Sequence, residues 1–185
     1  MIWDLPESLT VGGRTWAIRT DYRDILRVLI AFDDPELTPT EKQYICMRII
    51  YKDFDQMPRA DYPEAYKEAV KFIDNGEESD NSGGPRTVDW EQDAKIMFPA
   101  INTAAGYEVR SVPQLHWWTF MGYFMEIQKG VYATVLSLRQ KKAKGKKLEK
   151  WEKEFWSANT DACVIRPKLT EEEKQEKEQL KALLG

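Results

Sequence analysis

The order of apolar and polar residues predicts a mostly helical chain that opens with a β-hairpin. Residues 8–11 and 14–19 flank Gly12-Gly13, a dipeptide that tolerates the positive φ of a two-residue turn. Because an isolated hairpin is only marginally stable in water, we expect this one to pack on another surface. Its apolar contacts are expected from Leu9, Val11, Trp16 and Ile18.

Three helices are predicted between the hairpin and residue 76. Asp21 can cap the first. Residues 38–41, Thr-Pro-Thr-Glu, open the second with an N-cap, a proline in the first turn and a capping-box glutamate. We expect Asp61, with Glu64 three residues further on, to cap the third helix, which Gly76 ends.

Residues 75–87, with the sequence NGEESDNSGGPRT, predict a mobile linker that is clearest from Glu77 to Gly84. The segment is polar, contains glycine and has no large apolar side chain, so it cannot contribute to a core. We interpret the parts on either side as halves of one fold, because each alone would be small for an independent core.

The second half is predicted to be helical as well. A first helix is expected to be kinked at Pro99 and to end at Gly106. Residues 111–114, Ser-Val-Pro-Gln, carry a capping-box pattern that predicts the start of the next helix. A long helical stretch follows from about Val131 to Trp156, with a bend expected around Gly145.

These elements predict a mainly α fold: a bundle of about six helices with an N-terminal β-hairpin and a charged C-terminal helix. We place a single helical domain at residues 1–156, with the hairpin at 1–20 and the mobile linker at 75–87. Residues 157–185 are expected to form a linker and a charged tail helix that opens at Thr170. Three apolar residues near its end favour self-association, and docking on the same chain is the alternative; they are Leu180, Leu183 and Leu184.

Composition and charge narrow the class of protein. The chain has 185 residues, of which 42% are hydrophobic and 12% aromatic, so a core rich in large rings is expected. Its 27 basic and 31 acidic residues give a net charge of −4. No stretch approaches the roughly 20 apolar residues that span a bilayer, and no signal peptide is visible. We therefore expect an intracellular protein that does not enter a membrane.

The scarce residue types argue against catalysis. A single histidine, His116, and two distant cysteines, Cys46 and Cys163, cannot supply the usual four-ligand zinc site. The phosphate-binding, dinucleotide-binding, zinc-protease and serine-hydrolase motifs are absent from the sequence. The sequence therefore predicts a protein that is not an enzyme and has no catalytic residue, metal site or cofactor.

Two polar features could in principle form a catalytic or a metal site. His116 has no evident cysteine or serine partner, so we interpret it as a core histidine that holds one hydrogen bond. Asp89 and Asp93, four residues apart, could chelate a cation. The preferred interpretation places Asp89 at a helix N-terminus, where the helix dipole favours negative charge.

The most informative helix spans residues 115–127, with the sequence LHWWTFMGYFMEI. Its large side chains cover nearly the whole circumference, which is typical of a helix buried on several sides. The alternative is that some of them form a partner surface, since Trp, Tyr and Met are common at interfaces. The candidate partner-binding residues on this helix are Trp117, Trp118, Met121 and Met125.

A basic run, Arg139–Lys153, concentrates positive charge. It holds eight basic and two acidic residues, a local charge of +6, so the remainder of the chain sums to −10. Such runs can bind nucleic acid through phosphates, but the acidic chain and the lack of interleaved aromatics make nucleic acid the less favoured partner. An acidic protein surface, such as the tail of another copy, is the alternative. The candidate residues are Arg139, Lys141, Lys142, Lys146, Lys147 and Trp151.

Several of these segments together resemble one family. The sequences LHWWTFMGYF and KKAKGKKLEKWEKEFW, the preceding acidic stretch at residues 89–94 and the early residues 20–23 look like the gene-product-fifteen family of tailed bacteriophages. The resemblance covers nearly the whole chain and is most specific from Asp89 to Trp156. The family's genes lie in tail-morphogenesis clusters, typically near the tape-measure gene, where other long-tailed phages encode tail assembly chaperones. The resemblance brings no catalytic or ligand residue.

The resemblance implies a non-enzymatic tail morphogenesis protein of the host bacterial cytoplasm. Its expected role is that of a tail assembly chaperone, which binds the tape-measure protein before tail-tube polymerisation. The tail-tube protein is a second candidate partner, and self-association is expected. The alternatives are a structural tail component of the virion, which the lack of a long β-strand pattern weakens, and a nucleic-acid-binding protein that uses the run Arg139–Lys153.

Overall fold

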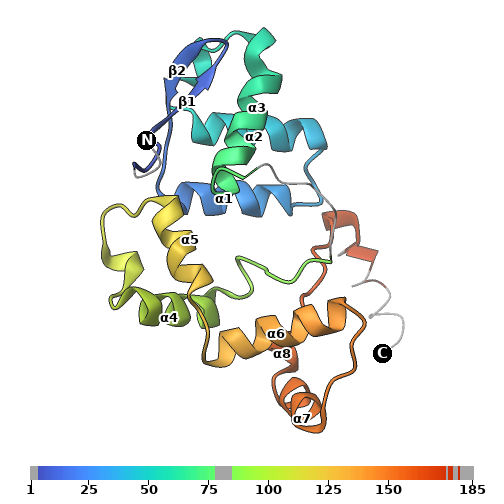
Figure 1. The fold of residues 1–185 in the computed structure, drawn as a ribbon. Coiled ribbons are helices and arrows are strands. Elements are labelled where there is room, and N and C mark those ends of the chain that lie inside the picture. The colour runs from blue at the N-terminus through green and yellow to red at the C-terminus, as the bar shows by residue number, and fades with distance from the viewer. Residues whose placement is uncertain (1–3, 78–84, 174, 177–178, 180–185) are drawn as a thin grey trace.

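The structure is a computed structural model that describes residues 4–77, 85–173, 175–176 and 179. It is mainly α, as predicted; the described residues include eight α-helices up to residue 163, a further helical segment from residue 171 and one two-stranded sheet. Figure 1 shows two lobes stacked along the length of the molecule. The N-terminal lobe comprises residues 4–77 and the C-terminal lobe residues 85–168.

The predicted hairpin is present at the far end of the N-terminal lobe. Strands β1 (Ser8–Val11) and β2 (Arg14–Ala17) pair in antiparallel fashion. Gly12 and Gly13 adopt φ angles of +58° and +72°, which L side chains rarely tolerate. A Cβ atom on Gly12 would also lie 2.8 Å from a carboxylate oxygen of Asp61, so the turn packs closely against the rest of the lobe.

The first two helices begin where the sequence predicts. The Asp21 side chain accepts a hydrogen bond from the Arg23 backbone amide at 2.9 Å, and the Thr38 and Glu41 side chains form a reciprocal capping box. Both caps satisfy amides that have no partner within their helix. The helices of this lobe are α1 (Tyr22–Phe32), α2 (Pro39–Ile50) and α3 (Tyr62–Ile73).

Helix α3 begins directly after Asp61, as predicted, but the prediction that the Asp61 side chain caps it is wrong. Asp61 ends a short 3₁₀ turn (η2, Arg59–Asp61) with φ −88° and ψ −8°, so it lacks the extended backbone that an N-cap side chain needs, and it makes no capping hydrogen bond. Glu64 instead accepts a hydrogen bond from the Gly12 amide at 3.0 Å. Its carboxylate therefore fastens the hairpin turn to α3.

The C-terminal lobe contains the remaining helices. The first of them continues through Pro99 and ends at Gly106, whose φ of +78° forms a left-handed C-cap, as predicted. The helices are α4 (Ala94–Ala105), α5 (Trp117–Met125), α6 (Val131–Ala143), α7 (Lys150–Ala158) and α8 (Thr160–Cys163).

The predicted start of α5 at residues 111–114 is wrong. Residues 109–111 form a 3₁₀ turn, η3, and the chain then stays extended. The Leu115 amide donates to the Asp21 carboxylate at 3.0 Å, and the Leu115 carbonyl accepts from the Tyr22 amide at the same distance. These long-range hydrogen bonds hold the segment extended, so helix formation is delayed until Trp117.

The predicted long helix from Val131 to Trp156 is two helices, α6 and α7, joined by a turn. Gly145 takes a φ of +67°, which places the chain reversal where a bend was expected. A new capping box between Glu149 and Glu152 then starts α7. This break, together with the short α8, brings the helix number above the predicted six.

Two predictions fall largely on residues that the structure leaves undescribed. The predicted mobile linker at 75–87 includes residues 78–84, and the three terminal leucines of the predicted tail helix lie beyond residue 179; both lie outside the described residues. The described residues 171–173 at the start of that tail are helical.

Across the described ranges, no helix has both the length and the apolar character that a membrane crossing requires.

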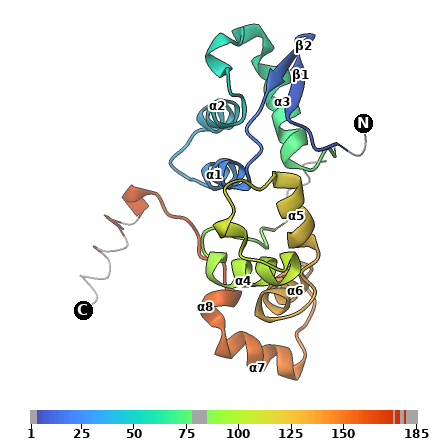
Figure 2. The same cartoon turned by 90° about the vertical axis from the view of Figure 1, so that its left-hand side faces the viewer.

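The two lobes share one hydrophobic core. Buried residues from the hairpin, α1, α2 and α3 and from α4, α5 and α6 form a single cluster. At its centre the rings of Tyr22 and Phe120 stack with centroids 4.4 Å apart and an interplanar angle of 4°. Figures 1 and 2 show the corresponding arrangement, with α5 standing between α1 above and α4 below.

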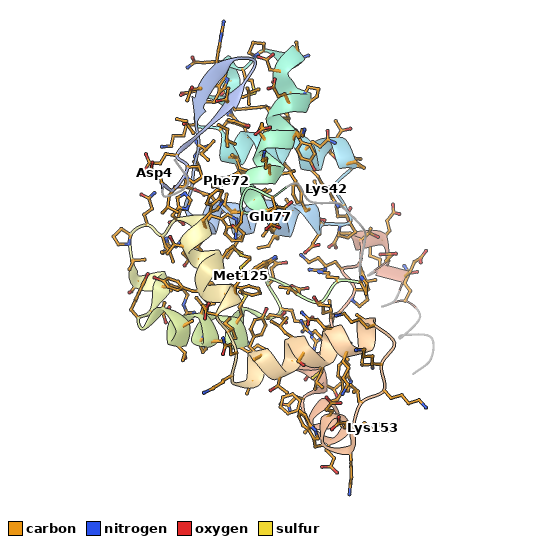
Figure 3. All side chains as sticks on the ribbon, viewed as in Figure 1. Asp4, Lys42, Phe72, Glu77, Met125 and Lys153 are labelled. Carbon is orange, nitrogen blue, oxygen red and sulfur yellow. The ribbon has the colours of Figure 1, made fainter. Side chains whose placement is uncertain are left out.

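A pair of tryptophans at the start of α5 holds the end of α3. The indole N–H of Trp117 donates to the Ile73 carbonyl and that of Trp118 to the Phe72 carbonyl, both at 2.8 Å. Figure 3 labels Phe72 at this end of α3. The last carbonyls of a helix have no intrahelical partner. Trp117 supplies the hydrogen bond that the Ile73 carbonyl lacks, and Trp118 adds one to the Phe72 carbonyl, which also accepts from the Asn75 amide at 3.2 Å. We refer to Trp117, Trp118 and these two carbonyls as the tryptophan clamp.

The clamp generates a stability prediction. Trp117→Phe keeps an aromatic ring but leaves the buried Ile73 carbonyl without its donor, so we expect a loss of about 1–3 kcal/mol in the free energy of unfolding. Urea denaturation followed by circular dichroism measures it. Trp151→Phe, on an exposed tryptophan, is the matched control and should change stability by less than about 0.5 kcal/mol. Equal effects of the two variants would contradict the role of the clamp.

Candidate partner-binding surface

The aromatic helix α5 serves mainly as a core element. Trp117 and Phe120 are fully buried, and Trp118 and Met121 are half-buried at the contact with the N-terminal lobe. Met125, in the last turn, is 65% exposed. Of the four residues predicted on this helix, Met125 is therefore the one whose side chain is open to a partner in this conformation.

His116 has a defined structural role that differs from the predicted one. It is the N-cap of α5: its Nδ1 accepts a hydrogen bond from the Trp118 amide at 3.1 Å, so Nε2 carries the proton. That nitrogen lies 3.1 Å from the Pro6 carbonyl oxygen. The histidine thus makes two hydrogen bonds instead of one and is half-buried instead of fully buried.

Arg139 lies inside the C-terminal lobe, although the sequence placed it on a partner surface. Both oxygens of the Asp93 carboxylate accept hydrogen bonds from its guanidinium at 2.7 Å. Its remaining N–H groups donate to three backbone carbonyls, so all five guanidinium donors are used. Those carbonyls belong to Thr87, Ala162 and Cys163.

The acidic stretch before α4 organises the same network. Asp89 accepts hydrogen bonds from the amides of Glu91 and Gln92, which caps the turn that leads into α4, and it pairs with Arg86 at 3.0 Å. Because Asp93 is occupied by Arg139, the alternative of a cation held by Asp89 and Asp93 is wrong. Within the described ranges no group of three His, Cys, Asp or Glu side chains is arranged to hold a metal ion.

The Gln92 side chain binds α8 and the chain that follows it. Its side-chain amide donates to the carbonyls of Asp161 and Val164 and accepts from the Arg166 amide. Trp90, two residues earlier, packs against Trp117 with ring centroids 6.1 Å apart. The stretch 89–93 therefore connects α4, α5, α6 and the chain after α8.

The basic run is divided between internal and external roles. Lys141 pairs with Glu152 at 2.7 Å and so ties α6 to α7, and the Lys142 ammonium lies 4.1 Å from the centre of the Trp156 ring. Trp151 is 55% exposed. Five further lysines of the run are exposed and form no ion pair with the residues that the structure describes: Lys144, Lys146, Lys147, Lys150 and Lys153.

A groove that sequence analysis missed lies along the outer face of α4. We call it the α4 groove. It has a volume of about 670 Å³ between α4, the α5–α6 connection and the start of α6, and its apolar lining includes Ile96, Pro99, Ala100, Ile127 and Val131. No local pattern predicts it, because its two walls come from residues 95–104 and 126–132, which only the packing of α4 on α6 brings together.

A second groove lies in the N-terminal lobe and was also missed. We call it the α2–α3 groove. It has a volume of about 780 Å³ and runs between α2, α3 and the chain that connects them. Its lining is rich in aromatic and methionine side chains, namely Tyr44, Met47, Phe54, Met57, Tyr62 and Tyr66.

The Arg139 network yields a second prediction. Arg139→Ala removes one partner of a buried pair and leaves the Asp93 carboxylate uncompensated, so the free energy of unfolding should fall by about 3–5 kcal/mol. Chemical denaturation provides the measurement. Lys146→Ala, which removes an exposed cation of the same run, should stay within about 0.5 kcal/mol of the wild type. A similar small effect from both substitutions would refute the internal role of Arg139.

The comparisons with known proteins agree with the resemblance of the central segments. The family model described as Bacteriophage Gp15 protein matches residues 2–161, which is most of the chain. The search of curated proteins found no match, and the search of solved structures found none. The matched range includes the tryptophan clamp, the stretch 89–93, Arg139 and both grooves. The chain belongs to the bacteriophage Gp15 family.

Proposed function

We propose that this phage protein is a non-enzymatic tail assembly chaperone. In this role it binds the tape-measure protein in the host cytoplasm before the tail-tube protein polymerises. Membership of the bacteriophage Gp15 family makes this a phage protein. The role in tail morphogenesis is what the family resemblance implies. The observation that carries the proposal is the α4 groove, an open groove with a largely apolar lining.

The shape and chemistry of the α4 groove suit an amphipathic helix. Such helices bind by laying an apolar face into an apolar groove. Val131, in the wall of the groove, is 50% exposed, and the exposed Met125 precedes the α5–α6 connection that forms part of the groove. Methionine is flexible and adapts to differently shaped partners, which a chaperone of a long helical substrate needs.

The rim of the groove adds a charge preference. Lys95 and Lys129 line it together with one acidic residue, Glu126, and none of the three forms an ion pair within the described part of the chain. Two cations against one carboxylate favour a partner helix with acidic residues beside its apolar face.

The nucleophilic side chains of the described chain support a non-enzymatic role. Both cysteines are buried, and burial raises the pKa of the Cys46 thiol to about 12 and also raises the pKa of Cys163. A reactive cysteine needs the opposite shift. His116 uses both ring nitrogens in structural hydrogen bonds, so it is not free to act as a general base.

Co-expression tests the proposal. With the wild-type chain, the tape-measure protein should be recovered in a soluble complex that survives gel filtration. Val131→Glu places a carboxylate on the apolar wall of the groove and should weaken the complex at least about tenfold, because an unpaired charge would be desolvated on binding. Trp151→Ala, on α7 and outside the groove lining, is the control and should leave this complex intact.

Two results would overturn the chaperone role. One is a tape-measure protein that stays equally soluble without this chain and forms no complex with it. The other is the presence of this polypeptide, found by mass spectrometry, in purified mature particles. That second outcome would support the alternative of a structural tail component, since a chaperone leaves before the virion is complete.

A further inference from the structure

The two lobes of the molecule carry opposite net charge of equal size. Residues 4–77 contain 10 basic and 15 acidic side chains, a charge of −5, whereas residues 85–168 contain 14 basic and 9 acidic side chains, a charge of +5. Figures 1 and 2 both place these lobes at opposite ends of the molecule. The chain as a whole is only weakly acidic, but it is electrically polar along its length.

The positive end presents an aromatic side chain that is not part of the core. Trp151 lies in the first turn of α7, at the end of the molecule remote from the hairpin, where Figure 3 labels the neighbouring Lys153. Its indole N–H lies 3.2 Å from a Glu149 carboxylate oxygen, so the ring is held in place although it is exposed. Around it in sequence stand the five exposed lysines that form no ion pair with described residues, Lys144, Lys146, Lys147, Lys150 and Lys153. We call this surface the α7 tip.

The negative end presents a cavity of complementary chemistry. The α2–α3 groove lies in the lobe of charge −5, and its own charged lining residues are Asp55 and Arg59. Tyr44 at its edge is 49% exposed and stands edge-on to Phe54, with ring centroids 5.3 Å apart. The hydroxyls of Tyr44, Tyr62 and Tyr66 form no hydrogen bond with the described residues. The groove therefore offers aromatic faces, methionines and hydroxyls to an incoming aromatic ring.

We propose that copies of this protein associate head to tail, with the α7 tip of one copy bound in the α2–α3 groove of the next. A few hot-spot residues contribute most of the binding energy of a protein interface. Tryptophan is strongly enriched among them, and it binds by filling a pocket in the partner. The lysines around it would meet a lobe of net charge −5, which supplies electrostatic complementarity. Because the two surfaces lie at opposite ends of the molecule, the α7 tip of one chain cannot bind the α2–α3 groove of the same chain.

The arrangement is heterologous: each copy contributes a different surface to each contact. Such contacts leave one tip and one groove unused at the ends of an open oligomer, so the assembly either closes into a ring or continues as a filament. This association uses neither the α4 groove nor the terminal leucines, and it stands independently of the tape-measure proposal.

Sedimentation of the full chain at several concentrations and salt levels tests the contact. The wild type should form concentration-dependent oligomers at low salt that weaken as salt is raised, because exposed charges are screened. Trp151→Ala and Tyr44→Lys change opposite ends of the molecule at exposed positions, and each should weaken association by about 30-fold or more. Circular dichroism establishes that both variants remain folded.

Mixing the two variants gives the sharpest result. Trp151→Ala retains an intact groove and Tyr44→Lys retains an intact tip, so a mixture should form a one-to-one heterodimer that cannot grow. Neither variant alone should dimerise under the same conditions. A symmetric contact, in which the same patch meets itself, would give no such rescue.

Control variants separate this contact from the other surfaces. Val131→Glu, in the α4 groove, and Leu183→Ser, in the C-terminal tail, should both associate like the wild type. The proposal is overturned if the wild type is monomeric at low salt and high concentration, if the mixture gives no heterodimer, or if Leu183→Ser abolishes association while Trp151→Ala does not. The last result would assign self-association to the tail.

Discussion

The fold depends on two indole N–H groups that complete the end of a helix in the other lobe. Without Trp117, the Ile73 carbonyl would lie at the end of α3 against α5 with no donor, a costly state for a buried backbone group, and without Trp118 the Phe72 carbonyl would keep only backbone donors of its own C-terminal turn. The clamp also orients α5. With its first turn fixed on α3, the helix brings Phe120 onto Tyr22 and closes the shared core.

The residues by which the family resemblance is recognised are therefore largely architectural. The two tryptophans hold the lobes together, and residues 89–93 hold α4, α6 and the chain after α8 together through Arg139 and Gln92. Binding partners are better sought on surfaces that these residues leave free. The α4 groove, the α7 tip and the α2–α3 groove meet that condition, and they lie on different sides of the scaffold that the clamp creates.

Local signals predicted the parts of the fold that local chemistry decides. The hairpin turn, the Asp21 cap, the capping box at residues 38–41 and the end of α4 at Gly106 all depend on neighbours in sequence. Prediction failed where hydrogen bonds between residues far apart in sequence decide the local structure. The Asp21 carboxylate accepts from the Leu115 amide and keeps that segment extended, and the Glu64 carboxylate accepts from the Gly12 amide of the hairpin. The interior position of Arg139 and both grooves depend on packing between segments far apart in sequence. Hydrophobic periodicity and helix-capping motifs are local signals and do not predict such packing.

The most direct test of this account is to cut the chain between residues 77 and 85, with a protease site inserted there, and to follow the two fragments by gel filtration. If the clamp and the shared core hold the lobes, the fragments should co-elute as one folded complex, and the same cut in a Trp117→Phe, Trp118→Phe background should release them more readily. Separation of the wild-type fragments under native conditions, with each retaining its own helical structure, would contradict the claim that these tryptophans unite the fold.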